Sequence, residues 1–286
     1  MWRGVGAWIV LACGSAALAA APAPAPARRV VSLNPSLTAM LIALGGRDAL
    51  VGVDDYSARS PAAAGLPSVG GLYNPSLEAV VALAPDLVVF VPSAEQRGFR
   101  ERLEALAIPR LVLDPVSFDD VLDAIHRIGA AIGREREAEA RIAAIRATRA
   151  RVEAAARALP PLRGVLVLQR EPLFVAGRGT FVDDMLRSLG VTNLAAEQPG
   201  RWPRLAREWL IVAAPELIVD SSPDPEPALA HWGRWPSLPA VERGAVVTLP
   251  VGVATLPGPD LDQALLTLAA AVRGEAFAAS VRPAAR

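Results

Sequence analysis

The stretch that decides the fold is residues 77–89, LEAVVALAPDLVV, which returns as residues 207–219, REWLIVAAPELIV. In both copies a glutamate, Glu78 or Glu208, opens a short amphipathic run that is followed by a proline, an acid and an apolar run. Proline cannot continue a helix, and such an apolar run is typical of a strand buried on both faces. Each copy therefore predicts one helix-to-strand unit of a parallel sheet, with one glutamate at the same place.

A weaker repeat precedes each copy, because residues 40–45 and 185–190 share the spacing of a helix that ends on glycine. Four strands are expected in the N-terminal part, at residues 29–33, 49–53, 87–89 and 110–113. Asn34 is expected to cap a helix over residues 37–44, and Asn74 to begin the first repeated helix. Strands alternating with helices predict parallel sheets. The chain is therefore expected to be an α/β protein with two Rossmann-like lobes. The expected boundaries are residues 29–116 for the N-terminal lobe (lobe one), 117–160 for a linker helix, 161–275 for the C-terminal lobe (lobe two) and 276–286 for a tail.

The linker is expected to be one long helix over residues 118–158. Val121, Leu122 and Ile125 keep helical spacing, and residues 134–157 contain neither proline nor glycine. Such a run forms a semi-rigid helix with a rise of about 1.5 Å per residue. Placed between two lobes, it would act as a stiff strut, so large hinge closure is not expected.

The N-terminus has the pattern of a secretory signal: a short positive start, a small apolar run and small residues at a cleavage site. We expect residues 1–20 to be the signal peptide and the alanine- and proline-rich residues 21–28 to be a tether. Cys13, the one cysteine of the chain, lies in a segment that resembles a lipoprotein cleavage box, which leaves lipidation there as the alternative. These features predict a periplasmic protein whose mature form has no disulfide.

Composition excludes several functions. The 29 basic and 29 acidic residues balance to a net charge of zero, which argues against binding nucleic acid or a membrane surface. Two histidines are too few for most metal sites, and His126 and His231 are expected to be structural. The adjacent acids at 54–55 and 183–184 are expected to be caps. No nucleophile turn, phosphate-binding loop or histidine–carboxylate motif is present, so we expect neither an enzyme nor a resident cofactor or metal.

Export, two lobes, a strut and no catalytic apparatus suggest a solute receptor. The sequence resembles the periplasmic solute-binding proteins with a helical backbone (class III), which serve ABC importers of cobalamin, ferric siderophores and haem. Within that family it is most similar to the cobalamin-binding members. The matching segments are residues 52–57 (GVDDYS), 77–88 and 202–208 (WPRLARE), and the resemblance covers roughly residues 29–272.

The resemblance implies a ligand and a partner. It implies that the ligand is a corrinoid, that Tyr56 lines the corrinoid-binding site and that Trp202 packs against the ligand. It also implies that Glu78 and Glu208 meet arginines on the two transmembrane subunits of an ABC importer. Two carboxylates related by an internal repeat suit a symmetric partner, and exposed Arg–carboxylate pairs fix register and orientation. The receptor itself is expected to be a monomer.

The other ligand-binding candidates lie in two segments that are expected to be loops and that the same resemblance places at the cleft. They are Gly71, Leu72, Tyr73, Gly252, Val253, Ala254, Thr255 and Leu256. Both segments depart from the cobalamin-binding members, which have a tryptophan at the first and polar and aromatic residues at the second. Tyrosine and tryptophan faces suit the flat, mostly apolar edge of a corrin ring.

Three alternatives stay open. A ferric siderophore on the same scaffold would need cationic side chains at the cleft, for which Arg59, Arg178, Arg201 and Arg204 are candidates. A haem receptor would need an axial tyrosine or histidine, for which Tyr73 is the candidate. From a different class, an enzyme or a sensor domain could reuse the fold.

Overall fold

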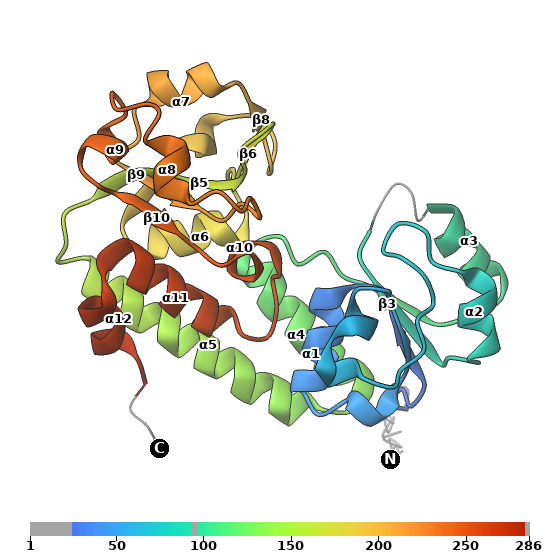
Figure 1. The fold of residues 1–286 in the computed structure, drawn as a ribbon. Helices are drawn as coiled ribbons and strands as arrows, with labels where there is room; N and C mark the ends of the chain where they lie inside the picture. The colour runs from blue at the N-terminus through green and yellow to red at the C-terminus, as the bar shows by residue number, and fades with distance from the viewer. Residues whose placement is uncertain (1–24, 93–96, 284–286) are drawn as a thin grey trace, which may run out of the picture.

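The computed structural model describes residues 25–92 and 97–283, which form two lobes joined by helices (Figure 1). The expected signal peptide, Cys13 and residues 21–24 of the expected tether lie outside the described residues. Lobe one contains a parallel sheet of order β2-β1-β3-β4. Its strands are β1 (Val30–Ser32), β2 (Leu50–Val53), β3 (Leu87–Phe90) and β4 (Arg110–Val112). The parallel sheet predicted for this lobe is confirmed.

The helices of lobe one begin at capped positions. Asn34 caps α1 as predicted, because its side chain accepts a hydrogen bond of 2.9 Å from the amide of Ser36. The predicted start of the first repeated helix at Asn74 is wrong: Ser76 is the N-cap of α2 and accepts a bond of 3.2 Å from the amide of Ala79. The α-helices are α1 (Pro35–Ala43), α2 (Leu77–Ala82) and α3 (Arg97–Ala105), and the 3-10 turns are η1 (Arg47–Ala49), η2 (Ser57–Arg59) and η3 (Pro61–Ala63).

The linker consists of two helices, α4 (Phe118–Ile132) and α5 (Glu135–Ala156), so the prediction of one continuous helix is wrong. The break falls at Gly133, whose φ of 67° is left-handed and ends α4. The two helices pack as an antiparallel hairpin, since a Cβ on Gly129 would lie 2.5 Å from that of Ala138. At the other end of the hairpin, the Arg149 guanidinium lies 4.5 Å from the ring centroid of Phe118. The 22 residues of α5, about 33 Å long, form the strut.

Lobe two contains a mixed sheet of order β10-β9-β5-β6-β8, with β7 also paired to β5. The strands are β5 (Leu162–Gln169), β6 (Leu173–Val175), β7 (Val191–Asn193), β8 (Arg204–Leu205), β9 (Leu217–Asp220) and β10 (Val246–Thr248). Strands β10, β9, β5 and β7 are parallel, but β6 is antiparallel to both β5 and β8. The expectation of a purely parallel sheet is therefore wrong for this lobe, because a hairpin turn, and not a helix, joins β5 to β6.

Two segments of the C-terminal third that were expected to be a loop and a tail are helical. Helix α10 occupies the segment expected to be a cleft loop. Helix α12 occupies most of the segment expected to be a tail, and its Ala278 and Val281 are buried. The helices of lobe two are α6 (Phe181–Ser188), the 3-10 turn η4 (Leu194–Glu197), α7 (Arg207–Ala213), α8 (Ala228–Trp232), α9 (Pro239–Glu242), α10 (Val251–Thr255), α11 (Leu261–Arg273) and α12 (Glu275–Val281).

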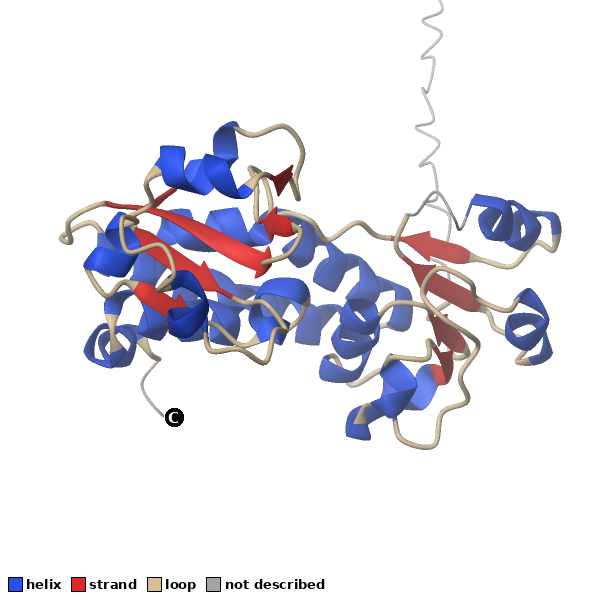
Figure 2. Cartoon of the chain, turned by 45° about the horizontal axis from the view of Figure 1, so that its top comes forward, coloured by secondary structure: helices blue, strands red, loops and turns tan. Residues whose placement is uncertain are grey.

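Each sheet is covered on both faces, and Figure 2 shows the two sheets in red with helices between them. One continuous apolar core joins the inner faces of both sheets through α1, α4, α5, α6 and α11. A second core under α2 and α3 covers the outer face of the first sheet, and a third under α7 and α8 covers that of the second. Helices α2 and α7 therefore lie on the sides of their lobes away from the linker helices (Figure 1).

The internal repeat extends to backbone conformation. Ala84 and Ala214 precede the two repeated prolines, and both are left-handed, with φ of 42° and 47°. A non-glycine residue in that region costs about 1–2 kcal/mol, so the same uncommon conformation at both positions reflects a shared turn. The residue before a proline avoids the right-handed helical region, and both helices therefore end at this point.

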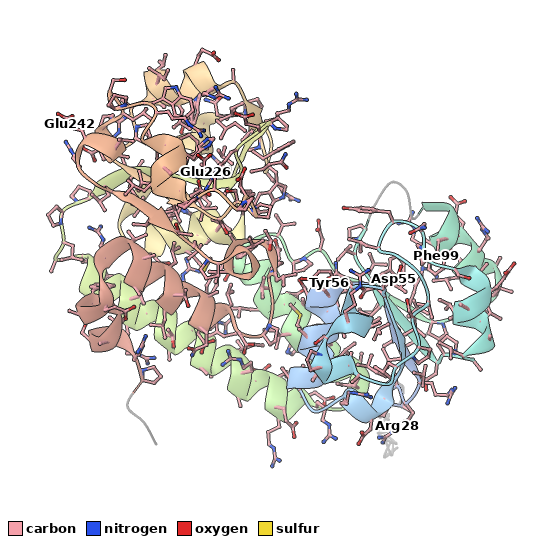
Figure 3. The ribbon with its side chains drawn as sticks, in the orientation of Figure 1. Arg28, Asp55, Tyr56, Phe99, Glu226 and Glu242 are labelled. Atoms are coloured by element: carbon pink, nitrogen blue, oxygen red, sulfur yellow. The ribbon has the colours of Figure 1, made fainter. Side chains whose placement is uncertain are left out.

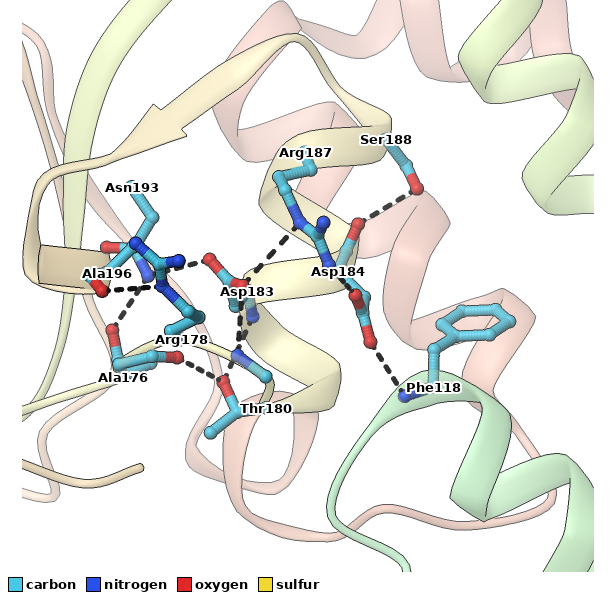
Figure 4. Close-up of polar contacts among 12 residues, drawn as sticks. Phe118, Ala176, Arg178, Thr180, Asp183, Asp184, Arg187, Ser188, Asn193 and Ala196 are labelled. Carbon is cyan, nitrogen blue, oxygen red and sulfur yellow. Dashed lines mark hydrogen bonds and ion pairs between the residues drawn. The ribbon is translucent and has the colours of Figure 1, made fainter. Parts of the chain in front are cut away.

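The junction between lobe two and the linker rests on the N-terminus of α6 (Figure 4). The Asp184 carboxylate accepts a hydrogen bond of 2.9 Å from the backbone amide of Phe118, the first residue of α4. The amide of Phe181 donates to the carbonyl of Val116 at 2.6 Å. Asp183 accepts bonds from Gly179 and Asn193. These acids are structural, as the sequence analysis expected.

Candidate ligand-binding cleft

A cleft of about 790 Å³ lies between the two lobes. On the lobe-one side it is lined by Arg59, Leu72 and residues that follow the four parallel strands within one to four positions: 34–36 after β1, 54–56 after β2, 91–92 after β3 and 114–116 after β4. On the lobe-two side it is lined by Leu168 in β5, Phe181, Trp202 and part of α10. Ligands of open α/β sheets bind at this carboxyl edge, which makes the cleft the candidate site.

The loop after β2 is shaped by Asp54. This carboxylate is buried, and its Oδ1 accepts hydrogen bonds from the amides of Tyr56 at 3.0 Å and Ser57 at 2.9 Å. Its Oδ2 accepts a bond from the Ser57 hydroxyl at 2.5 Å. The turn directs Tyr56 outwards, where its side chain is 61% exposed and lines the cleft. Figure 3 shows Tyr56 beside Asp55 at the edge of lobe one that faces lobe two.

Six of the predicted ligand-binding residues line the cleft: Tyr56, Leu72, Trp202, Ala254, Thr255 and Leu256. The aromatic pair spans it, since Tyr56 belongs to lobe one and Trp202 to lobe two. Trp202 is 40% exposed, so much of its ring is open to a ligand.

Four predicted residues are not among the lining residues: Gly71, Tyr73, Gly252 and Val253. Tyr73 is 65% exposed outside the cleft, and a Cβ at Gly71 would lie 2.5 Å from the Asn74 side chain. Gly252 and Val253 line an adjoining groove of about 330 Å³ that α1 and α11 also line and that shares Pro35, Ser36 and Leu256 with the cleft. The physical reason is that residues 251–255 form a helix, which presents successive side chains to different surroundings, where a loop was expected.

Part of the lining was not predicted from sequence. Asp114, Pro115 and Val116 follow β4 after one intervening residue, and Phe181 begins α6. A usable signal was present, because β4 was predicted correctly and the residues after parallel strands converge at one sheet edge.

The charge of the cleft is predominantly acidic. Asp54, Asp55 and Asp114 line it together with a single cation, Arg59, and its described lining contains no lysine or histidine. The Ser68 hydroxyl donates a hydrogen bond to Asp55. Asp114 lies 3.5 Å from Nη1 of Arg201, which is an ion pair between the two lobes.

The arginines considered for an anionic ligand are mostly engaged elsewhere. Arg178 donates to the Ala196 carbonyl at 2.9 Å and forms an ion pair with Glu197 at 2.7 Å. Arg204 lies in β8, outside the cleft lining. Arg59 is the arginine that lines the cleft and has no ion pair with any residue that the structure describes.

The histidines are not placed to bind a ligand metal in the cleft. His126 Nδ1 lies 2.9 Å from Glu139 in the α4–α5 hairpin. His231 is buried in lobe two, with its ring 4.8 Å from that of Trp232. Within residues 25–92 and 97–283, no group of three or more His, Cys, Asp or Glu side chains could hold a metal ion.

Glu78 and Glu208 are equivalent in the structure as in the sequence. Each lies in the first turn of its short helix, α2 or α7, and each is exposed. Neither carboxylate has a hydrogen bond or ion pair with a residue of the described chain. They are free to meet a partner.

Comparison with known proteins places the chain in a family. Over residues 30–251 it matches the model of the periplasmic binding protein family. It is 27% identical over 221 residues to the vitamin B12-binding protein of Photorhabdus laumondii, covering 77% of this chain and 79% of that protein.

Two solved structures share the fold. The periplasmic vitamin B12 binding protein BtuF of Vibrio cholerae superimposes with a TM-score of 0.74 and 23% identity, covering 90% of this chain and 97% of the other. A periplasmic haem-binding protein from Pseudomonas aeruginosa superimposes with a TM-score of 0.70 and 27% identity, covering 91% and 95%. In the described part of the chain, no helix has both the length and the apolar character needed to span a membrane. The match over residues 30–251 and the two-lobed fold show that the chain belongs to the periplasmic binding protein family.

Proposed function

We propose that this protein is a periplasmic receptor that captures a corrinoid in the cleft between its lobes and delivers it to an ABC importer. The observation that carries the proposal is that Tyr56 and Trp202, from opposite lobes, line one cleft of about 790 Å³. Two rigid aromatic faces on opposite walls suit a large, flat and mostly apolar ring system. The proposal contains no chemical step, in keeping with a family of binding proteins.

The acidic lining favours a corrinoid over a polyanion. Asp54, Asp55 and Asp114 would repel the carboxylates of haem or the charge of a ferric catecholate. Arg59 in the lining and Arg201, which is paired with Asp114, offset this negative charge only in part. The amide side chains of a corrinoid carry no charge and present N–H donors, which carboxylate oxygens accept. Cobalamin therefore fits this lining better than an anionic ligand does.

Delivery is supported by the two exposed glutamates. Glu78 and Glu208 occupy equivalent positions in a repeated unit and lack partners within the described chain, so they suit a partner with two equivalent cationic sites. We propose that these sites are on the two transmembrane subunits of the importer. Residues 1–20 would direct export as a signal peptide. Lipidation at Cys13 is the alternative way in which the N-terminus would be processed.

Calorimetric titration of the protein, produced without residues 1–20, with cyanocobalamin tests the ligand. Saturable one-to-one binding is expected. A folded protein that releases no heat and shows no absorbance change would overturn the corrinoid assignment.

Haem is the second candidate ligand, and the position of Tyr56 in the cleft favours it. Its phenol is exposed in the cleft, and a tyrosine oxygen can be the axial ligand of haem iron. Titration with haemin, followed by the Soret band, tests this candidate. A one-to-one spectral shift that Tyr56→Phe abolishes would replace cobalamin by haem.

A further inference from the structure

Large apolar side chains are exposed on the two helices that bear the free glutamates. Val81 on α2 is 41% exposed, and on α7 Ile211 and Val212 are 47% and 84% exposed. A soluble helix normally turns polar residues to water. An exposed apolar side chain standing alone needs no explanation, but a recurring group of them marks an interaction surface.

These side chains recur at the same positions of the repeat. Val81 lies three residues after Glu78, and Ile211 lies three residues after Glu208. Residues three and four apart share one face of a helix, so each glutamate and its apolar neighbour form one exposed surface. The opposite face of each helix is packed, with Val80 and Leu210 buried in the outer cores.

The charge on this surface indicates its occupant. Each apolar side chain lies beside an unpaired carboxylate, so a matching surface must offer a cation beside an apolar hollow. The surface occurs once in each lobe, so the occupant must offer this arrangement twice. A two-fold pair of membrane subunits meets both requirements, whereas a second copy of this chain would bring glutamate against glutamate.

We propose that Val81, Ile211 and Val212 are apolar anchors that complete the two importer contacts begun by Glu78 and Glu208. This inference rests on the proposed delivery function. The glutamates steer and orient the receptor, and the anchors lose water on docking and slow its dissociation.

The two contacts are unequal. The fourth residue after each glutamate is Val212 in lobe two but Ala82 in lobe one. Lobe two therefore presents the larger apolar area, and its contact is the stronger one.

The test measures binding of the cobalamin-loaded receptor to purified permease–ATPase complexes of its own organism, held in nanodiscs, at 0.1 M and 0.5 M NaCl. For Val81→Ser with Ile211→Ser we expect affinity to fall about 25-fold, roughly fivefold at each distant site. The change in this affinity between the two salt concentrations should be the same as for the unaltered protein. For Glu78→Ala with Glu208→Ala we expect that change to be smaller.

Matched variants separate docking from folding. Val212→Ser should weaken docking about fivefold, and Ala82→Ser should leave it unchanged. Leu229→Ser, at a side chain 60% exposed on α8, should also leave it unchanged. Affinity for cyanocobalamin and the melting temperature should match the unaltered protein in every variant.

The outcomes are distinct. Unchanged docking by the valine and isoleucine variants, with weakened docking by the glutamate variants, would overturn the anchors and leave delivery intact. Failure of the unaltered, loaded receptor to bind any importer complex would overturn both proposals.

Discussion

Asp86 and Glu216 hold the same position in the two repeats and make the same contact at the start of the first strand of their sheets. The amide of Asp86 donates to the carbonyl of Arg29 at 2.9 Å, and its Oδ1 accepts from the amide of Arg29 at 2.9 Å. The amide of Glu216 donates to the carbonyl of Arg163 at 2.8 Å, and its Oε2 accepts from the amide of Arg163 at 3.1 Å. The acid after each repeated proline thus fixes where neighbouring strands begin.

This contact predicts sensitivity to acid. The hydrogen bond from the Arg163 amide, followed by that from Arg243, lowers the pKa of Glu216 below its ordinary value of 4.5. The unfolded chain therefore takes up the proton first, so the stabilisation is complete above pH 4.5 and disappears as the pH falls through the folded-state pKa. Glu216→Gln should lower the urea midpoint at pH 7 and have a smaller effect at pH 3. Glu242→Gln, exposed nearby, is the control, and an equal effect of both variants would contradict the assignment.

The buried ion pair of lobe two predicts a larger effect. Arg170 Nε lies 2.9 Å from Asp220 Oδ2, both side chains are buried, and Trp232 Nε1 donates to the same oxygen at 2.6 Å. Removing one member of such a pair costs about 3–5 kcal/mol, because the other charge stays buried. Asp220→Asn should therefore lower the free energy of unfolding by about that amount in urea at pH 7.

The control for this pair is Asp123→Asn, which removes an exposed ion pair with Arg127 at 3.5 Å. Surface pairs contribute about 0–1 kcal/mol. If Asp220→Asn lowers the free energy of unfolding no more than the control does, the buried ion pair does not stabilise lobe two as predicted.

The turn between the linker helices predicts a strict requirement for glycine. Gly133 has a φ of 67°, and a Cβ there would lie 2.8 Å from Cγ of Pro26. Gly133→Ala should therefore destabilise the protein by more than the roughly 1–2 kcal/mol of a left-handed alanine alone. Gly65→Ala is the matched control, since Gly65 has a φ of 83° with open space around it. Thermal unfolding compares the two, and equal costs would exclude a contribution from Pro26.

The cleft predicts different roles for the two tyrosines. Trp202→Ala should weaken cyanocobalamin binding about 10- to 100-fold, and Tyr56→Ala about tenfold, because each removes an aromatic face from the cleft wall. Tyr73→Ala should leave the affinity unchanged, because this equally exposed tyrosine lies outside the lining. Calorimetry on the three variants decides, and a loss confined to Tyr73→Ala would move the site away from this cleft.

Local signals predicted much of the fold. The Asn34 cap, the four strands of lobe one and the repeated helix-to-strand unit all depend on neighbouring residues, and all are present. The break at Gly133 was visible as a glycine, but helical spacing on both sides of it favoured one helix. Helix α12 was missed because part of its stability comes from packing on α5, which is distant in sequence, as well as on the neighbouring α11.

Part of the candidate site was predicted from sequence: six of the 21 residues that line the cleft. Tyr56 and Trp202 stand in recognisable motifs, and they line the cleft. Tyr73 is also a loop tyrosine, in a segment that departs from the family, and no local pattern says whether its side chain reaches the cleft. What separates the two tyrosines is the turn made by Asp54, which directs Tyr56 to the cleft.

Two related α/β lobes, each with one glutamate at the start of a short helix, could be inferred from the sequence. These features depend on the order of neighbouring residues and on the internal repeat. The tertiary structure alone decided which side chains share the cleft, that Asp114 and Arg201 meet across it, and that Val81 and Ile211 remain exposed. These depend on how separate elements pack, and the burial of a side chain is set by distant parts of the chain.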